Sequence, residues 1–371
     1  MKKIFALILA LCMVLALAAC GQQAAPAEKP ADTPAEQPAE QPAEQPAEQP
    51  AEQPAADGNY RLGMGISLNM NGSKEGNAQV DACCAAVVTD SEGKIVKVVI
   101  DVAQNKMGLS EEEFDPFKSF TTKRWLGDDY NMVKYSSATH EWYEQVAAFE
   151  QYIIGKTAEE VAGMETVVNE EGHSVTTDEA LYATCSISIS DFQDAVVKAC
   201  NDEQGMDFTA EGEFKLGLDI QSDAEDSTEA TDEEDGVVKM YSHFGAAVVD
   251  ENGVILAALI DATQPQVKYD VDGAIVETVY NGSKRELKED YNMVKYSEAT
   301  LEWYQQSWNL AEYAVGKTVD ELDDVYYHGL VENEEGHHVF ADEALLASCS
   351  ISVDDMLYVV ISAARFAGHW D

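Results

Sequence analysis

The sequence contains few basic residues. Only 23 Lys and Arg stand against 69 Asp and Glu among 371 residues, which gives a formal net charge of −46. Removing Lys2 and Lys3 with an N-terminal signal would change this to 21 minus 69, or −48. A surface this acidic repels phosphate backbones and anionic headgroups. Nucleic acid and anionic lipid are therefore poor partners.

Long apolar runs are absent after the first twenty residues, so no later segment is expected to span a bilayer. The first segment has a basic head, an apolar run from Ile4 to Ala16 and the letters LAAC at residues 17–20. This pattern predicts a signal peptide over residues 1–19. LAAC resembles the lipobox of bacterial lipoproteins, which implies a diacylglycerol on Cys20 and anchorage at the extracytoplasmic face of the cell membrane. An ordinary cleaved signal is the alternative.

Proline is scarce outside one tract. Eight of the ten prolines lie between Gly21 and Asp57, where PAEQ is repeated five times from Pro34 to Gln53. Such a tract cannot bury apolar surface, and its prolines favour an extended path. We therefore predict that residues 20–57 combine the lipidated cysteine with a disordered linker that holds the folded part away from the membrane.

One string of eight residues occurs twice in the chain. DYNMVKYS stands at Asp129–Ser136 and again at Asp290–Ser297, a spacing of 290 minus 129, or 161 residues. That spacing is the length of a domain and far longer than a solenoid repeat. We predict two tandem homologous domains over residues 58–206 and 207–371, called copy one and copy two below, each with its own core.

The order of elements within copy one follows from its apolar periodicity. The β-rich runs Val80–Val88 and Ile95–Ile100 flank a turn and predict a hairpin. Apolar residues at helical spacing follow the string from Trp142 to Ile153. We place another strand at Cys185–Ser188 and a final helix capped by Ser190. The expected class is α+β, with a largely antiparallel sheet and helices on one face in each copy.

Cysteines are also few. Five remain after Cys20, and an odd number excludes a complete disulfide framework. Cys185 and Cys349 are equivalent in the two copies and are predicted to fill buried positions. Cys83 and Cys84 are neighbours on a predicted strand, so they should point to opposite faces, which disfavours a bond between them.

Catalytic and metal-binding signatures are missing. There is no nucleophile elbow, no HExxH and no spaced acid pair repeated in both copies. The GKT triplets at residues 155–157 and 316–318 lack the earlier glycine of a phosphate-binding loop. His173, His337 and His338 adjoin carboxylates, but only one histidine is common to both copies. We predict neither catalytic activity nor a metal site.

A dense acidic run lies near the start of copy two. Nine of the seventeen residues from Asp219 to Asp235 are Asp or Glu. Their spacing matches no EF-hand loop, and like charges extend a chain. The run is therefore predicted to be a solvated, mobile insertion.

Polar residues that both copies share mark a candidate site. They lie after a strand end or before a long helix, where backbone donors attract anions. We predict that in each copy they surround one concavity for a small anionic ligand: Asp101, Gln104, Lys134, Tyr135 and Ser136, with Asp261, Gln264, Lys295, Tyr296 and Ser297 as counterparts. The alternative is that the string only caps and packs a helix entry, and that recent duplication preserved it.

The strand GKIVKVVID and a later S-x-A-T at the head of a helix resemble the FMN-binding domain of bacterial surface lipoproteins. In that family a D-x-x-S-G-A-T motif opens a helix, and its last threonine can be esterified to FMN. The resemblance implies that Thr139 and Thr300 are the acceptor equivalents and that FMN is the cofactor. The glycine of the motif is replaced by Ser137 and Glu298, and its aspartate falls on valine in both copies.

These observations together predict a membrane-anchored extracytoplasmic lipoprotein. We expect it to act as a non-catalytic small-molecule binding or redox-carrier module that resembles FMN-binding proteins. A cell-surface scaffold without a small-molecule ligand is the alternative, and a hydrolase is a third. The colour of the purified protein would separate the first two, because bound flavin is yellow.

Overall fold

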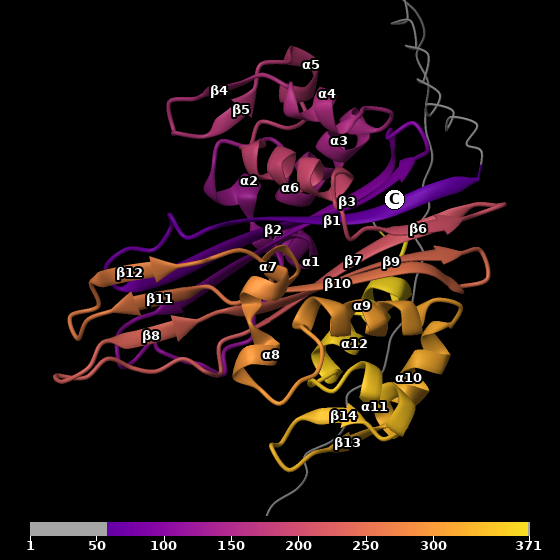
Figure 1. Cartoon of the computed structure of the whole chain (residues 1–371). Coiled ribbons are helices and arrows are strands. Elements are labelled where there is room, and N and C mark those ends of the chain that lie inside the picture. Colours follow the sequence, from indigo (N-terminus) through magenta and orange to yellow (C-terminus); the bar gives the residue numbers. More distant parts are fainter. Residues whose placement is uncertain (1–57, 370–371) are drawn as a thin grey trace, which may run out of the picture. The chain divides into compact units, whose positions relative to one another are not determined.

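The structure, a computed structural model, describes residues 58–369 (Figure 1). The predicted signal peptide, Cys20 and the proline-rich linker lie outside the described residues. No helix between residues 58 and 369 is long and apolar enough to cross a membrane. The α+β class with antiparallel sheets is confirmed.

A hairpin organises the first sheet. Gly93, with φ of 76°, permits the turn between β2 (Asn77–Asp90) and β3 (Ile95–Gly108). β1 (Asn59–Asn69) pairs with β2, and β6 (Met206–Thr209) pairs with β1. The order is β3-β2-β1-β6, with all neighbours antiparallel. The predicted hairpin is confirmed, although its strands are longer than expected.

Copy two builds the corresponding sheet from two pieces. One has the order β10-β9-β7, and the other has the order β12-β11-β8. Pro265 lies between β10 and β11, at the position that Asn105 occupies inside the unbroken β3, and a proline has no amide for the ladder. The strands are β7 (Phe214–Asp223), β8 (Gly236–Lys239), β9 (Tyr241–Asp250), β10 (Ile255–Thr263), β11 (Gln266–Tyr269) and β12 (Ile275–Val279).

The helices follow the same order in both copies. Copy one contains α1 (Lys123–Leu126), the 3-10 turn η1 (Gly127–Tyr130), α2 (Met132–Tyr135), α3 (Trp142–Ile153), α4 (Ala158–Ala162), α5 (Glu179–Tyr182) and α6 (Ser190–Cys200). Copy two contains α7 (Lys284–Leu287), η2 (Lys288–Tyr291), α8 (Met293–Tyr296), α9 (Trp303–Ala314), α10 (Val319–His328), α11 (Glu343–Ser348) and α12 (Asp354–Arg365). Short hairpins join the later helices: β4 (Thr166–Val168) with β5 (Ser174–Thr176), and β13 (Leu330–Glu332) with β14 (His338–Phe340).

Two equivalent glycines let the last helix of each copy lie directly on its sheet. A Cβ at Gly63 would stand 2.0 Å from the carbonyl oxygen of Ala199 in α6. A Cβ at Gly217 would stand 1.9 Å from that of Ala363 in α12. Any side chain at these positions would push the helix off the strand.

The two copies share one core. One face of the first sheet, with Met64 and Cys84, packs in the same cluster as Leu216 and Leu218 of the second sheet. A separate cluster under α3 and α6 belongs to copy one alone. Figure 1 shows the strands between helices α3 to α6 on one side and α9 to α12 on the other. The described residues therefore stack helices, sheet, sheet and helices.

The sequence pattern predicts a separate core in each copy, whereas the structure has a core that both copies share. The strand β2 gives the physical reason. Cys83 and its alternate neighbours face the helices, whereas Cys84 and its alternate neighbours face copy two. A strand that is apolar on both faces needs cover on both. The predicted domain limit at residue 206 also falls inside β6, which pairs with β1.

Three local predictions are corrected by the structure. Cys185–Ser188 is irregular and not a strand, because the Ser186 amide donates to the Gln145 side chain (2.9 Å). α6 begins at Ser190, with no side-chain hydrogen bond at its N-cap, Ile189. Asp219, the start of the acidic run, lies buried in β7, and the strand continues to Asp223. The first part of that run is therefore a paired strand rather than a mobile insertion.

The described cysteines are free thiols. Cys185 and Cys349 are buried, as expected, although in irregular segments. Burial raises the pKa of each of these thiols to about 12, so both stay protonated at neutral pH.

Candidate functional site

The repeated string builds a tight turn at the entry to the long helix. Asn131 has φ of 56° and Asn292 has φ of 59°, a left-handed conformation that asparagine tolerates. The Met132 amide donates to the Glu141 carboxylate at 2.8 Å, and the Met293 amide donates to Glu302 at 2.8 Å. Much of the identity between the copies therefore serves a backbone reversal.

The polar end of the string lies on the surface. Tyr135 and Tyr296 are each 77 % exposed. Lys134 Nζ lies 4.7 Å from the centroid of the Tyr135 ring, and Lys295 Nζ lies 4.6 Å from that of Tyr296. The remaining predicted residues of this end, Ser136, Ser297, Thr139 and Thr300, are also exposed.

The predicted aspartates lie elsewhere, inside the protein. Asp101 accepts hydrogen bonds from the Thr122 hydroxyl (2.6 Å) and the Arg124 amide (3.1 Å). Asp261 accepts from the Arg285 amide at 3.0 Å. Each carboxylate thus fastens a short helix, α1 or α7, to a strand. Asp101 lies in the middle of β3, not past a strand end as predicted, and Asp261 lies near the end of β10. The structure does not bring the aspartates together with the lysine and tyrosine at the end of the string.

The predicted glutamines are both half-buried; Gln264 directly follows β10, whereas Gln104 lies inside the longer β3. Gln264 Oε1 accepts a hydrogen bond from the hydroxyl of Tyr291, a residue of the string, at 3.1 Å. Gln104 occupies the equivalent place on β3. This hydrogen bond links a predicted residue after β10 to the string in copy two.

Burial raises the pKa of Asp261 from 3.8 to about 6, although Arg285 and the hydrogen bonds to the carboxylate oppose the shift. The folded state therefore binds the proton more tightly than the unfolded state, and this group favours folding most at low pH. We expect the free energy of unfolding of the full chain to fall relative to that of Asp261→Asn as pH rises from about 4 to 7, by at most about 3 kcal/mol. Chemical denaturation of both proteins across that range measures the difference. An unchanged or rising difference would contradict the shift.

The first tyrosine of the string and the first residue of the long helix, a tryptophan, lie around a lysine in both copies. Lys123 Nζ lies 5.2 Å from the ring centroid of Tyr130 and 5.6 Å from that of Trp142. Lys284 Nζ lies 5.1 Å from each of the corresponding rings, Tyr291 and Trp303. Aromatic faces attract cations at this range.

The arginine that directly follows this lysine has a different ion-pair partner in the two copies. Arg124 pairs with the buried Glu150 of α3 at 2.7 Å, inside copy one. Copy two has Ala311 at the position of Glu150. Arg285 instead crosses to copy one, where it pairs with Asp202 at 3.0 Å and donates to the Gln204 carbonyl at 2.7 Å.

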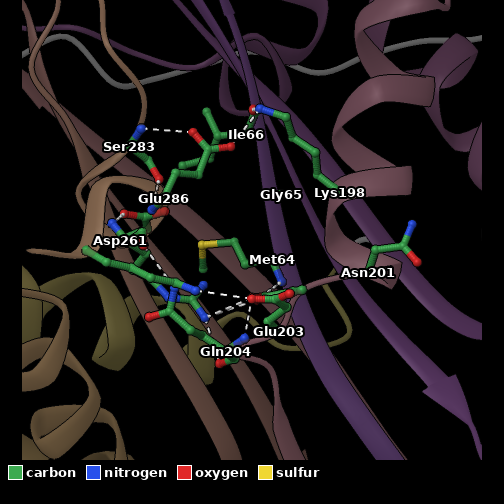
Figure 2. A pocket seen from close by; sticks show the side chains of 13 residues that line it. Met64, Gly65, Ile66, Lys198, Asn201, Glu203, Gln204, Asp261, Ser283 and Glu286 are labelled. Carbon is green, nitrogen blue, oxygen red and sulfur yellow. Dashed lines mark hydrogen bonds and ion pairs between the residues drawn. The ribbon is translucent and has the colours of Figure 1, made fainter. Parts of the chain in front are cut away.

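This crossing arginine borders a pocket of about 330 Å³ between the copies (Figure 2). Asp261, one of the predicted residues, lines it beside Met64 and Gly65 of β1. Two further ion pairs join the copies here, Lys198 with Glu286 at 2.7 Å and Lys288 with Glu203 at 3.1 Å. The pocket therefore holds cations and carboxylates in roughly equal measure.

A second pocket of about 350 Å³ shares Gln204 with the first. Its other walls come from α9 and from Leu301, two residues before that helix; the α9 residues are Tyr304, Gln305, Trp308 and Asn309. These walls are largely apolar and aromatic. Thr300, the acceptor equivalent of copy two, directly precedes Leu301 in the chain.

The corresponding region of copy one has a different chemistry. A pocket of about 390 Å³ is bordered by Asp128, Asp129 and Tyr143, together with His369 from copy two. Trp125 stacks on His369, with ring centroids 5.8 Å apart. Ala147 stands where copy two has Trp308. Trp308 is not among the predicted site residues, because those residues are common to both copies and the counterpart of Trp308 is not aromatic.

Within residues 58–369, no three His, Cys, Asp or Glu side chains converge as metal ligands would. The six predicted site residues of each copy are thus divided: four lie in an exposed segment, the aspartate is buried and the glutamine is half-buried. The hollows between the copies are lined mainly by other residues. No family model, no curated protein and no solved structure matches the chain.

Proposed function

We propose that the chain is a membrane-anchored extracytoplasmic module that binds a small aromatic anion of the flavin phosphate class, FMN, and has no catalytic activity of its own. The observation that carries this proposal is the contact between an aromatic pocket and a charged pocket at Gln204. A planar ring joined to a phosphate has the same two-part character.

The aromatic pocket suits the ring system. Trp308 and Tyr304 offer faces on which a planar heterocycle can stack. The charged pocket suits the phosphate. The Lys288 and Lys198 side chains are 39 % and 46 % exposed, so each can exchange its surface carboxylate for a phosphate without losing a buried partner. Arg285, whose side chain is only 6 % exposed, keeps Asp202.

Covalent attachment is the second form that this function can take. The resemblance to FMN-binding domains implies Thr139 and Thr300 as acceptors, and both side chains are exposed. Thr300 adjoins the aromatic pocket through Leu301, whereas the Thr139 hydroxyl lies 3.1 Å from His140 Nδ1. We therefore favour Thr300. The anchor through Cys20 belongs to the same proposal and rests on the signal pattern and the linker.

Flavin binding is expected to depend on Trp308. Trp308→Ala should weaken FMN binding by about tenfold or more, since stacking on an aromatic side chain contributes about 1–3 kcal/mol. The measurement is flavin fluorescence quenching on the full chain isolated from membranes. Tyr143→Ala, which removes the copy-one counterpart of Tyr304, is the matched control and should leave the affinity unchanged.

The intact mass of the same preparation reports lipid on Cys20 and any flavin on Thr300, and Thr300→Val should abolish only the latter. A wild-type protein that binds no FMN, or equal affinity after Trp308→Ala, would overturn the proposal and favour the scaffold alternative. Loss of binding in Tyr143→Ala alone would move the site to copy one.

A further inference from the structure

Lys284 is a buried amine without a polar partner. Only 8 % of the residue's surface is accessible, and its Nζ makes no hydrogen bond or ion pair with any residue between 58 and 369. Its contacts are the rings of Tyr291 and Trp303. The exposed lysines Lys198 and Lys288, by contrast, both have carboxylate partners. A buried ammonium usually needs such a partner.

The groups that face Lys284 come from several elements. Asp223 of β7 and Asp261 of β10 act on it electrostatically, and it acts in turn on His243 of β9. Around these stand Tyr241, Tyr291, Asp354 and Asp355. Burial lowers the pKa of Lys284 to about 8, although Asp261 and Asp223 oppose the shift. Burial, followed by Lys284 itself, lowers the pKa of His243 to about 4.

We infer that Lys284 is a covalent capture site for a small aldehyde or ketone, which it holds as an imine between the rings of Tyr291 and Trp303. The Nζ lone pair adds to the carbonyl carbon while the C=O π bond breaks and its oxygen takes up a proton. Nζ then loses a proton, the hydroxyl takes up a second proton and leaves as water while the C=N bond forms, and Nζ loses its other proton. The exchange consumes one carbonyl compound and releases one water, with no change of oxidation state. The neutral imidazole of His243 can accept and return the proton.

Copy one supplies an internal comparison. Lys123 has the same two aromatic neighbours but is half-exposed. Cys83 stands in place of His243, and Asn69 in place of Asp223. The aromatic cage alone is therefore common to both lysines, whereas the deep burial and the electrostatic interaction with an imidazole belong to Lys284. This inference concerns another site than the flavin pockets and does not depend on them.

The test uses the full chain, a small aldehyde such as acetaldehyde, and cyanoborohydride to reduce any imine to a stable amine. Near pH 7.5 about a quarter of an amine with pKa 8 is unprotonated, against about a thousandth of an ordinary lysine. Allowing for the weaker nucleophilicity of a less basic amine, we expect peptide mapping to show Lys284 modified about tenfold faster than Lys123, Lys134 or Lys295.

Two variants complete the experiment. Lys284→Arg should abolish the fast labelling, and His243→Gln should slow labelling at Lys284 while leaving Lys123 unchanged. The rate at Lys284 should reach half its maximum near pH 8. If wild-type Lys284 reacts no faster than Lys134, or if it reacts only above about pH 10, the lysine is a structural cation–π contact and the inference is wrong. The wild-type map decides this even if Lys284→Arg fails to fold.

Discussion

Copy one on its own, prepared as residues 58–206, should lose the single cooperative unfolding transition that we expect of the complete folded part. Separation uncovers the face of the first sheet that packs against copy two, which includes Leu62, Met64, Ile66 and Val99. Burial of one large apolar side chain contributes about 1.5–3 kcal/mol. Exposure of these four costs about 6–12 kcal/mol, which is as large as a typical total stability of about 5–15 kcal/mol. The fragment also lacks most of β6, which protects the edge of β1.

Near-ultraviolet circular dichroism and binding of a hydrophobic dye would measure this effect. We expect weak tertiary signals, strong dye binding and a broad thermal transition in the fragment, with residues 58–371 as the control. A sharp transition with the same midpoint in circular dichroism and fluorescence would show that copy one folds independently, as the sequence pattern alone predicts. The proposed domain limits would then stand.

The second large effect is expected from Glu150→Ala. Glu150 Oε2 accepts from Arg124 at 2.7 Å, and Oε1 accepts from the Ile100 amide at 2.6 Å. Both side chains are buried, so removal of the carboxylate takes away a buried acceptor from the guanidinium and the acceptor of an edge-strand amide. Breaking a buried ion pair from one side costs about 3–5 kcal/mol. Urea denaturation of the full chain should show a loss of this size.

Glu150→Gln is the matched control, because glutamine keeps the size and one acceptor oxygen. It should lose less stability than the alanine variant. Asp323→Ala, which breaks the more exposed pair with Arg365 on copy two, should cost no more than about 1 kcal/mol. A loss below about 1 kcal/mol in Glu150→Ala would mean that water replaces the carboxylate and that the pair contributes little.

Several elements could be predicted because their signals are local. The β2–β3 hairpin has apolar runs on both sides of Gly93. The positive φ of Gly93 needs no long-range contact. α3 follows from apolar residues at helical spacing, and its range, Trp142–Ile153, agrees with the prediction. The short strand predicted at Cys185 failed, because a side chain far away in the sequence, Gln145, takes the place of a ladder partner.

The candidate site was harder to predict for the same reason. The strand-end and helix-entry pattern located Asp261 near the end of β10, but Asp101 lies in the middle of the longer β3. The oxygens of both are used by the amides of α1 and α7. Whether a polar residue faces a ligand or the backbone depends on neighbours that the period of apolar residues does not reveal. The pockets at Gln204 depend on contacts between the copies.

The amino-acid order alone determined the duplication, the acidic surface, the N-terminal signal pattern and the principal hairpin and helices. These are properties of composition and short-range periodicity. The shared core and the pockets between the copies needed the folded coordinates. Arg285 crosses to Asp202 because Ala311 stands where Glu150 pairs with Arg124 in copy one, and that choice compares residues that are distant in sequence. An unpaired cation inside a protein moves toward the nearest available anion, and only packing decides which anion is nearest.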